Sequence, residues 1–473
     1  MSNKVMGKFF LLVCFFFHGL FVWAWDDDAA VVMGYGMWEI EGDTRILPPA
    51  RERFSFNNRR VELSMQMGVH ASNSFISYSD FFLNPFRILR NLIAADSFAD
   101  FQNNPSLYYR DQVSINIDDL FRGFRLNFGF DAAPFSLNIN MRDEWGFGLD
   151  IAHVTATGNL LIPEAVLGFH ETTGELFGAG GAVFVDIGIP VFFHTRGFRI
   201  SVRPAAYLPL VYVRPGFSYS FGPSHEGGGL GQRFEVSYDV RVFSPFSLEG
   251  LLGNSNGNTM EDIMQDPLGM VARNLGYDIT LGIEYPLNSL VSVGVNIVNI
   301  PFPFLWATLD NYTRLQGNMF FDTSYVNFGD AFGGGFELPE GAFGYSIEDP
   351  YFGTLSRGQR ILRPFTMLFF ANYRPFGTQT VTLIPSLGFS INQLYTRIAA
   401  LEGGLSARFD LANIFITTIG MNYNDRRWRH SMDLAFNFRV LELGIGVSMQ
   451  SPNFVKSFQG AGLGVNFGIK MGW

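Results

Sequence analysis

The feature that most constrains this chain is a two-residue alternation of apolar and polar side chains that recurs along its length. Successive side chains of a β-strand point to opposite faces, so this period predicts strands with one apolar and one polar face. We expect a turn at 131–134, and we expect Ile414, Ile416 and Thr418 to share an apolar face. The clearest alternating segments are 61–69, 124–130, 135–141, 145–151, 414–420 and 432–438.

The last eleven residues alternate without interruption and end on an aromatic side chain. Glycine, Asn466 and Lys470 occupy the positions between the apolar ones. This pattern resembles the terminal strand of bacterial outer-membrane proteins, which the barrel-assembly machinery recognises. We therefore predict a barrel-assembly signal made of Leu463, Val465, Phe467, Ile469, Met471 and Trp473.

A helical membrane protein does not fit the sequence. A spanning helix needs about 18 or more consecutive apolar residues. The stretch 287–309 has no charge, but Asn296 and Asn299 interrupt it and Pro301 and Pro303 break its end. Its valines recur every second residue, which is the period of a strand.

Composition points to lipid on one side of the strands. Charged residues make up 16% of the chain, aromatic residues 16%, and Phe alone contributes 52 residues. Hydrocarbon offers no water to satisfy an open sheet edge, so membrane-spanning strands must close on themselves. We predict an all-β fold: a transmembrane antiparallel β-barrel of about 14 strands, within a range of about 12 to 16.

The N-terminal sequence predicts an export signal over residues 1–24. Lys4 and Lys8 precede an apolar run, and we expect cleavage after Ala24, which predicts the bacterial outer membrane as the location. The single cysteine, Cys14, lies inside this segment, so thiolate chemistry is not expected in the mature protein. The net charge of −10 and the lack of a basic stripe make nucleic acid a poor partner. The expected partners are outer-membrane lipid and the assembly machinery.

Three segments interrupt the strand pattern. Residues 25–60 are irregular and are expected in the periplasm or the lumen. Residues 85–95 predict a helix, which either plugs the barrel or lies at the membrane interface. Counting back from the C-terminus places 322–360 outside as a long loop, and short turns near Gly377, Asp410 and Val440 in the periplasm.

The same count places 244–274, with a short helix around 260–273, on the periplasmic side, against the usual asymmetry. Either a strand near 302–309 is missing from the count, or this segment folds inward as a plug.

The segment 276–286, Gly-Tyr-Asp-Ile-Thr-Leu-Gly-Ile-Glu-Tyr-Pro, precedes another strand that ends at Asn299, Ile300 and Pro301. It resembles a segment of long-chain fatty-acid transporter-like barrels and of uncharacterised spirochaete outer-membrane barrels. Asn104-Pro105-Ser106 resembles the Asn-Pro-Ala of their N-terminal hatch, with Ala replaced. The resemblance implies passive import of hydrophobic or small solutes through a plugged barrel.

Catalytic and metal chemistry have little support. No two histidines stand at metal-ligand spacing, and neither Asp150 with His153 nor Asp425 with His430 has a nucleophile motif nearby. We expect no enzyme, metal or cofactor. Inward-facing arginines that tune lumen selectivity, or pair with lumen acids such as Asp131 and Asp150, are expected instead. These are Arg125, Arg199, Arg203, Arg408 and Arg439.

Two functions remain open from the sequence. The first is passive transport through a partly plugged lumen, with the solute unspecified. The second is a surface adhesin or structural barrel that acts through its outer loops, above all 322–360.

Overall fold

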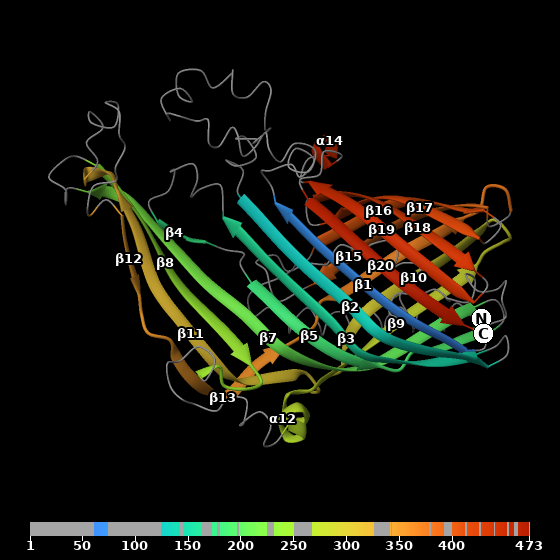
Figure 1. Ribbon diagram of the computed structural model, residues 1–473, viewed down its shortest axis with the longest axis horizontal. Coiled ribbons are helices and arrows are strands. Elements are labelled where there is room, and N and C mark those ends of the chain that lie inside the picture. Colours follow the sequence, from blue (N-terminus) through green and yellow to red (C-terminus); the bar gives the residue numbers. More distant parts are fainter. Residues whose placement is uncertain are drawn as a thin grey trace, which may run out of the picture.

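The computed structural model shows one large antiparallel β-barrel with a long sheet extending from one end (Figure 1). Among the residues that the structure describes, no helix is long and apolar enough to cross a membrane. The described residues are 61–73, 124–141, 145–162, 173–176, 180–195, 198–224, 231–249, 267–325, 341, 343–377, 380–391, 400–411, 414–424, 427–438, 440–451, 454–457 and 462–472.

Fourteen strands form a closed ring, as the sequence predicts. The first and last strands pair antiparallel from Glu62 opposite Gly472 to Ser72 opposite Gly462, so the ring has no open edge. In spatial order the ring consists of β1 (Val61–Asn73), β2 (Phe124–Met141), β3 (Trp145–Ile162), β5 (Gly180–Gly188) with its continuation β6 (Val191–Thr195), β7 (Phe198–Ser224), β9 (Gly276–Pro286), β10 (Val291–Pro301), β14 (Phe365–Tyr373), β15 (Val381–Ile391), β16 (Ala400–Leu411), β17 (Phe415–Asn424), β18 (Arg427–Phe438), β19 (Leu441–Ser451) and β20 (Gly462–Gly472).

The two faces of the ring differ in chemistry in the way the alternation predicts. In β20 the side chains of Val465, Phe467 and Met471 are exposed on the outside, whereas Lys470 is buried on the inside. Leu463 and Ile469 lie at positions of the same outward face. Polar residues such as Glu62, Asn296 and Glu442 are buried at inward positions of other strands. Apolar side chains therefore surround a polar lumen.

The turn expected at 131–134 is wrong. β2 runs through it as one strand, and its register with β1 shifts here, from Ser64 opposite Ser136 to Gln66 opposite Ala133, which leaves one extra residue in β2. This irregularity switches the outward set from even to odd positions, which explains why the apolar alternation changes phase at this point. Pro134 fits because a bulge needs no ladder donor from it.

The face assigned to 414–420 is also wrong in part. Within β17, Ile416 and Thr418 are buried on the inside, and Ile419 is half exposed on the outside. Phe415 and Ile419 are apolar residues of the outer face, and Ile416 is an apolar residue of the inner face. Because both faces carry apolar residues, the alternation does not determine which face points outward.

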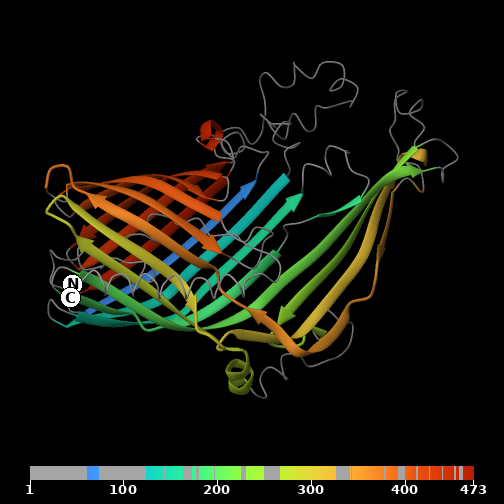
Figure 2. The same cartoon turned by 180° about the vertical axis from the view of Figure 1, so that it is seen from behind.

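Part of the same sheet, here called the flange, projects from one end of the barrel (Figures 1 and 2). β7 has 27 residues, which at a rise of about 3.3 Å each makes it roughly 90 Å long. Its first part belongs to the ring and its second part to the flange. The other flange strands are β4 (Thr173–Leu176), β8 (Gly231–Ser244), β11 (Ala307–Asp322), β12 (Phe343–Ile347) and β13 (Tyr351–Ile361).

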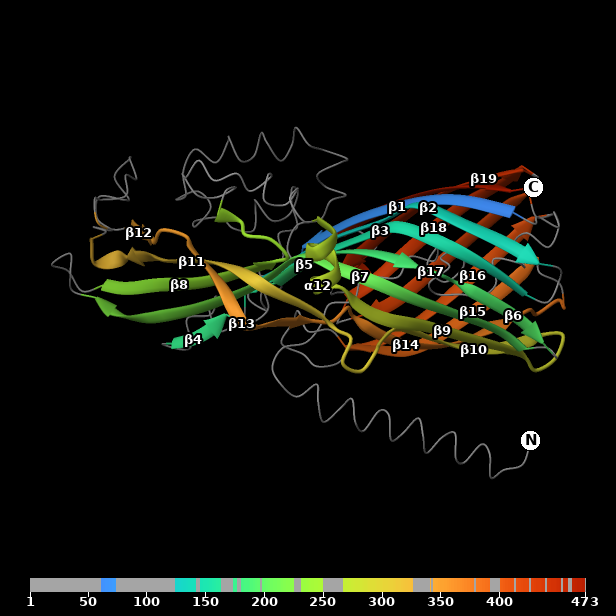
Figure 3. The same ribbon diagram turned by 90° about the horizontal axis from the view of Figure 1, so that it is seen from below.

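The expectation of one long loop at 322–360 is wrong in part, because β12 and β13 lie largely within that range and pair with β11. It also identifies the strand missing from the count near 302–309, since β11 begins at Ala307. The segment 244–274 consequently connects β8 to β9 where the flange meets the barrel. Its helix α12 (Pro267–Asn274) overlaps the predicted helix and lies at this junction (Figure 3).

The inner face of the barrel continues into the flange. Val183 faces Val211 but Phe184 faces Pro209, so Leu210 is an extra residue in β7. After this bulge the inward side chains are Tyr212 and Arg214. The outward apolar face continues in the same way along the other side of the sheet.

Short turns join the strands at the end of the barrel where β20 ends. Backbone hydrogen bonds run from the Gly472 amide to the Val440 carbonyl, and from the Arg374 amide to the Leu290 carbonyl. The chain reverses near Gly377, Asp410 and Val440 as predicted, at the end opposite the flange (Figure 1). Which end faces the periplasm stays a prediction.

Several predictions fall outside the described residues. They are the export signal 1–24, the irregular segment 25–60, the helix 85–95, the tripeptide at 104–106, Asp425, Arg439 and Trp473.

Candidate functional site

The inner wall near the flange carries a network of buried charges. Arg203 on β7 lies at its centre. Its Nε donates to Asp150 Oδ2 at 2.6 Å and its Nη2 to Asp186 Oδ1 at 2.5 Å. The three side chains come from the adjacent strands β3, β5 and β7 at inward positions, and none is more than 3% exposed. The network therefore joins neighbouring strands of the barrel wall.

Arg363 joins this network from the link between β13 and β14. Its Nε donates to Asp278 Oδ2 at 2.7 Å and its Nη2 to Asp278 Oδ1 at 2.6 Å, a bidentate pair. Its Nη1 also donates to Asp186. A single guanidinium thus bridges β5 and β9, and it holds the end of a flange strand against the barrel wall.

His153 extends the network to β2. Its ring nitrogens lie 2.8 Å from Asp186 Oδ2 and 3.1 Å from Asp131 Oδ2. Asp150 and His153 are three residues apart and would face opposite sides of a regular strand. A bulge at Ala152, with a φ of 55°, turns both inward. His153 is thus a satisfied lumen residue, and Asp150 pairs with Arg203 instead.

An apolar cluster lies beside the charges, where the flange begins. Tyr207 and Phe184 are at its centre, with ring centroids 6.1 Å apart. The Tyr207 hydroxyl donates to the Ile361 carbonyl at 2.9 Å, and the Arg363 guanidinium lies over the Tyr207 ring. A Cβ at Gly276 would lie 2.3 Å from Tyr207 Cζ, so β9 must begin with glycine here. The remaining members are Ala182, Tyr212, Phe243, Ala307, Leu309 and Ile361.

The predicted lumen arginines have different outcomes. Arg203 pairs with Asp150, one of the acids proposed for it. Arg199 reaches Glu284 at 3.4 Å, and Arg408 lies 3.5 Å from Asp410. All three stand at inward positions of their strands. The backbone of Arg125 lies in β2 opposite Leu161.

The sequence analysis missed Asp186, Asp278 and Arg363. Asp186 and Asp278 each interrupt an apolar strand at an inward position, so strand parity could have found them. Arg363 lies outside any strand, in the link at 362–364, and no periodicity marks it. Its role depends on contacts with Asp186 and Asp278, which lie 177 and 85 positions earlier in the chain.

His430 lies against the short helix α14 (Phe454–Ser457), where its Nε2 is 2.7 Å from Ser457 Oγ. The Ser457 hydroxyl donates to the Phe454 carbonyl at 2.5 Å, and the residue is fully buried. A hydroxyl in this position is not accessible to a substrate, and the contact fastens α14 to β18.

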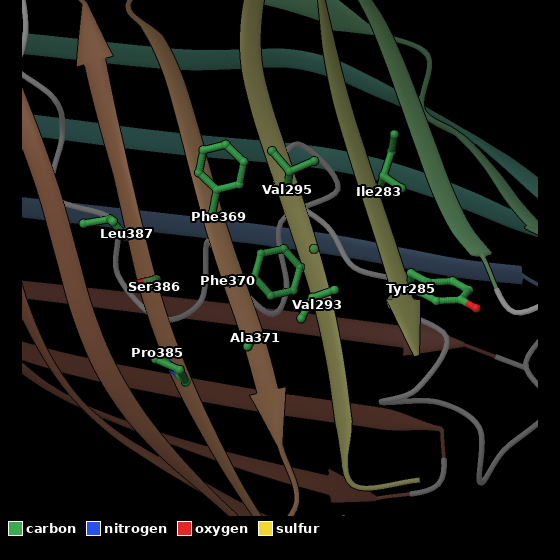
Figure 4. Close-up of a pocket in the computed structure, with 11 residues that line it drawn as sticks. Ile283, Tyr285, Val293, Val295, Phe369, Phe370, Ala371, Pro385, Ser386 and Leu387 are labelled. Carbon is green, nitrogen blue, oxygen red and sulfur yellow. The ribbon is translucent and has the colours of Figure 1, made fainter. Parts of the chain in front are cut away.

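A shallow groove lies on the wall over β9, β10, β14 and β15 (Figure 4). Val293, Phe369 and Leu387 are exposed around it. Phe370 instead points inward, and a Cβ at Gly294 would lie 2.3 Å from its Cζ. The groove is thus part of the apolar outer face of the barrel.

No family model matches the chain, and no curated protein matches it. Three solved barrels are similar over most of their length. They are the toluene transporter TodX of Pseudomonas putida (9% identity over 91% of this chain and 94% of that one, TM-score 0.41), a Pseudomonas aeruginosa FadL homologue (10%, 94% and 98%, 0.42) and the monoaromatic hydrocarbon channel CymD (8%, 91% and 95%, 0.39). These identities and TM-scores assign neither a family nor a function to the chain.

Proposed function

We propose that the protein is an outer-membrane barrel that lets hydrophobic or small solutes pass down their gradients through its lumen. The observation that carries this proposal is the closed ring of 14 strands with apolar residues outside and a charged inner wall. Barrels of about 8 strands are filled by their own side chains, whereas those of about 16 to 18 leave a channel. A ring of this size has room for a path that inward side chains narrow.

The charge network is the proposed narrow point of that path. Hydrogen bonds from several strands hold Arg203, Asp186 and Arg363 in place, so the proposed constriction is rigid. Fixed charges of both signs disfavour neither cations nor anions outright. Uncharged and apolar solutes are the class that such a wall delays least.

Flux through reconstituted vesicles tests the proposal. Wild-type protein is expected to release an entrapped uncharged dye of a few hundred daltons, and Arg363→Ala is expected to speed this release several-fold. Arg360→Ala is the matched control, because Arg360 lies three residues away over the Trp306 ring and is exposed. Folded protein that passes neither the dye nor a hydrophobic probe would rule out transport.

A second function has one observation in its favour. The edge strand β12 exposes Tyr345 and Ile347, with about 70% of each residue's surface accessible. Exposed apolar side chains of this kind are typical of binding surfaces. If the flange is an adhesin, deletion of 343–347 should abolish binding to immobilised fibronectin and leave the barrel closed. Unchanged binding would remove this function.

A further inference from the structure

The turn between β10 and β11 exposes an aromatic side chain at a strained backbone position. The Leu305 amide donates to the Phe302 carbonyl at 3.2 Å, which closes a four-residue turn. Pro303 is the second residue of this turn, and Phe304, with a φ of 68°, is the third. This is the pattern of a type II turn, whose third residue is usually glycine because bulky residues rarely adopt a positive φ. The chain thus has phenylalanine where the backbone disfavours it.

The protein leaves this side chain uncovered. Phe304 is 79% exposed, and Leu268, at the start of α12, is 82% exposed. They are the two most exposed large apolar side chains among the described residues. Both lie at the junction of barrel and flange, where α12 stands off the sheet (Figures 1 and 2). A strained and exposed aromatic residue does not stabilise the fold in water, so we expect another apolar phase to cover it.

Backbone hydrogen bonds hold the turn against the first residues of β9. The Tyr277 amide donates to the Leu305 carbonyl at 2.8 Å, and the Phe302 amide donates to the Tyr277 carbonyl at 3.1 Å. The side chain of Tyr277 is at an outward, exposed position of β9. The turn therefore lies beside the outward face of the barrel wall, at the level of Tyr277.

Tyr277 also marks one edge of the apolar band around the barrel. Tyr285 is the outward residue at the other end of β9, where its ring lies 4.6 Å from that of Phe198. The outward residues between the two tyrosines are Ile279, Leu281 and Ile283. At a rise of about 3.3 Å per residue and a tilt of about 35 to 45°, the tyrosines are separated by roughly 20 Å along the membrane normal. Aromatic residues flank an apolar band of about 25 Å in membrane barrels, so Tyr277 and the turn beside it belong to one interface.

We propose that the turn at 302–305, together with Leu268, inserts into the lipid leaflet at the flange end of the barrel. Lipid is the occupant because the outward face of β9, which contacts hydrocarbon in the proposed barrel, continues directly into the turn. The Trp306 ring lies 6.0 Å from that of Phe304, and the Arg360 guanidinium lies over Trp306. Tryptophan and arginine side chains favour the headgroup layer, so this pair sets the depth of the turn. The anchor keeps the flange clear of the membrane, and it does not depend on transport.

The test is the depth of a fluorophore attached to the turn. Phe304→Cys, in a Cys14→Ser background, is labelled with NBD, and the full chain is refolded into vesicles that contain nitroxide-labelled lipid. We expect emission shifted to the blue, and quenching that places the label about 5 to 10 Å into the boundary between headgroups and acyl chains. Tyr345→Cys on β12 is the matched control, because Tyr345 is an aromatic residue of similar exposure on the flange and its label should not be quenched. A label at Phe467→Cys, on the outward face of β20, reports the hydrocarbon core.

A label at Leu268→Cys is an independent probe of the same insertion. Its quenching should match that at position 304, and adding Phe304→Gly, which fits the backbone of the turn, should shift its emission toward that of a label in water. Labels at 268 and 304 that behave like the one at 345, in protein whose label at 467 is quenched, would overturn the proposal. So would a blue shift that depends on the protein-to-lipid ratio without quenching by the lipid, because a second copy would then cover the turn. Dye flux with an unquenched label at 304 would remove the anchor and leave the transport proposal in place.

Discussion

At the scale of single residues, Arg363 connects the two parts of the molecule. It stands where β13 leaves the flange and β14 enters the barrel, and it contacts carboxylates on β5 and β9. Buried charges of this kind contribute little net free energy when they are paired, but removing one partner leaves the other buried without compensation. The network consequently makes the junction specific in geometry.

We predict that Arg363→Ala lowers the free energy of unfolding by about 3 to 5 kcal/mol, because Asp278 loses both of its guanidinium hydrogen bonds. Adding Asp278→Asn should restore part of the lost stability, since the amide leaves no uncompensated charge buried. Urea unfolding in lipid vesicles, followed by tryptophan fluorescence, measures both variants. A double variant as unstable as the sum of the two single ones would contradict direct coupling.

At the scale of elements, the sequence predicted best those strands that have one apolar face. β9 and β10 end at the residues expected from their sequence, and β20 has the alternation that its outward face requires. The outward face of β17 was predicted wrongly because both of its faces carry apolar residues. The length of β7 was not predicted, since its second half continues the same alternation into a sheet beyond the barrel and nothing local marks the change.

The candidate site was predictable only where strand parity applied. Arg203 and Asp150 alternate with outward residues in their strands, so both were expected to face inward. His153 required a bulge at Ala152, and Arg363 required the long-range return of β13. Such contacts depend on tertiary geometry that local periodicity does not encode.

The cost of a charge on the outward face should depend on its position along β20. Phe467→Arg places a charge on the outward face near the middle of the strand and should destabilise the barrel by about 2 to 4 kcal/mol. Met471→Arg, on the same face next to the end of the strand, should cost about 0 to 1 kcal/mol. Refolding yields and urea midpoints in vesicles compare the two. Equal costs would mean that this face does not contact the hydrocarbon core.

The flange gives a prediction about pH. The folded pKa of Asp239 is lowered, so its pairing with Arg314 stabilises the flange above the ordinary carboxyl pKa of about 3.9 and is lost as pH falls through the folded value. Titration of 13C-labelled aspartate by NMR should show this carboxyl ionising below that ordinary value. In Arg314→Gln the pKa should rise toward it. An unchanged titration in that variant would show that Arg314 is not the cause.

At the scale of the whole molecule, the proposed transport depends on closure of the ring. The lumen and its proposed constriction have an enclosing wall because β1 pairs with β20. Hydrocarbon enforces this pairing, since an unpaired edge would leave backbone groups without partners. The flange strands can extend beyond the ring because water satisfies their edges there.

A disulfide across the seam tests closure directly. An ideal Cβ at Gly68 lies 3.6 Å from Asn466 Cβ, within the range of about 3.5 to 4.5 Å that a disulfide needs. Gly68→Cys with Asn466→Cys, in a Cys14→Ser background, should therefore cross-link on mild oxidation and give a band that migrates anomalously after boiling unless it is reduced. Gly68→Cys with Ser448→Cys should not cross-link, because Ser448 lies on β19, one strand beyond the seam, opposite Gly464. Absence of the first cross-link in folded protein would mean that the chain does not close between these strands, and the lumen and its constriction would then have no enclosing wall.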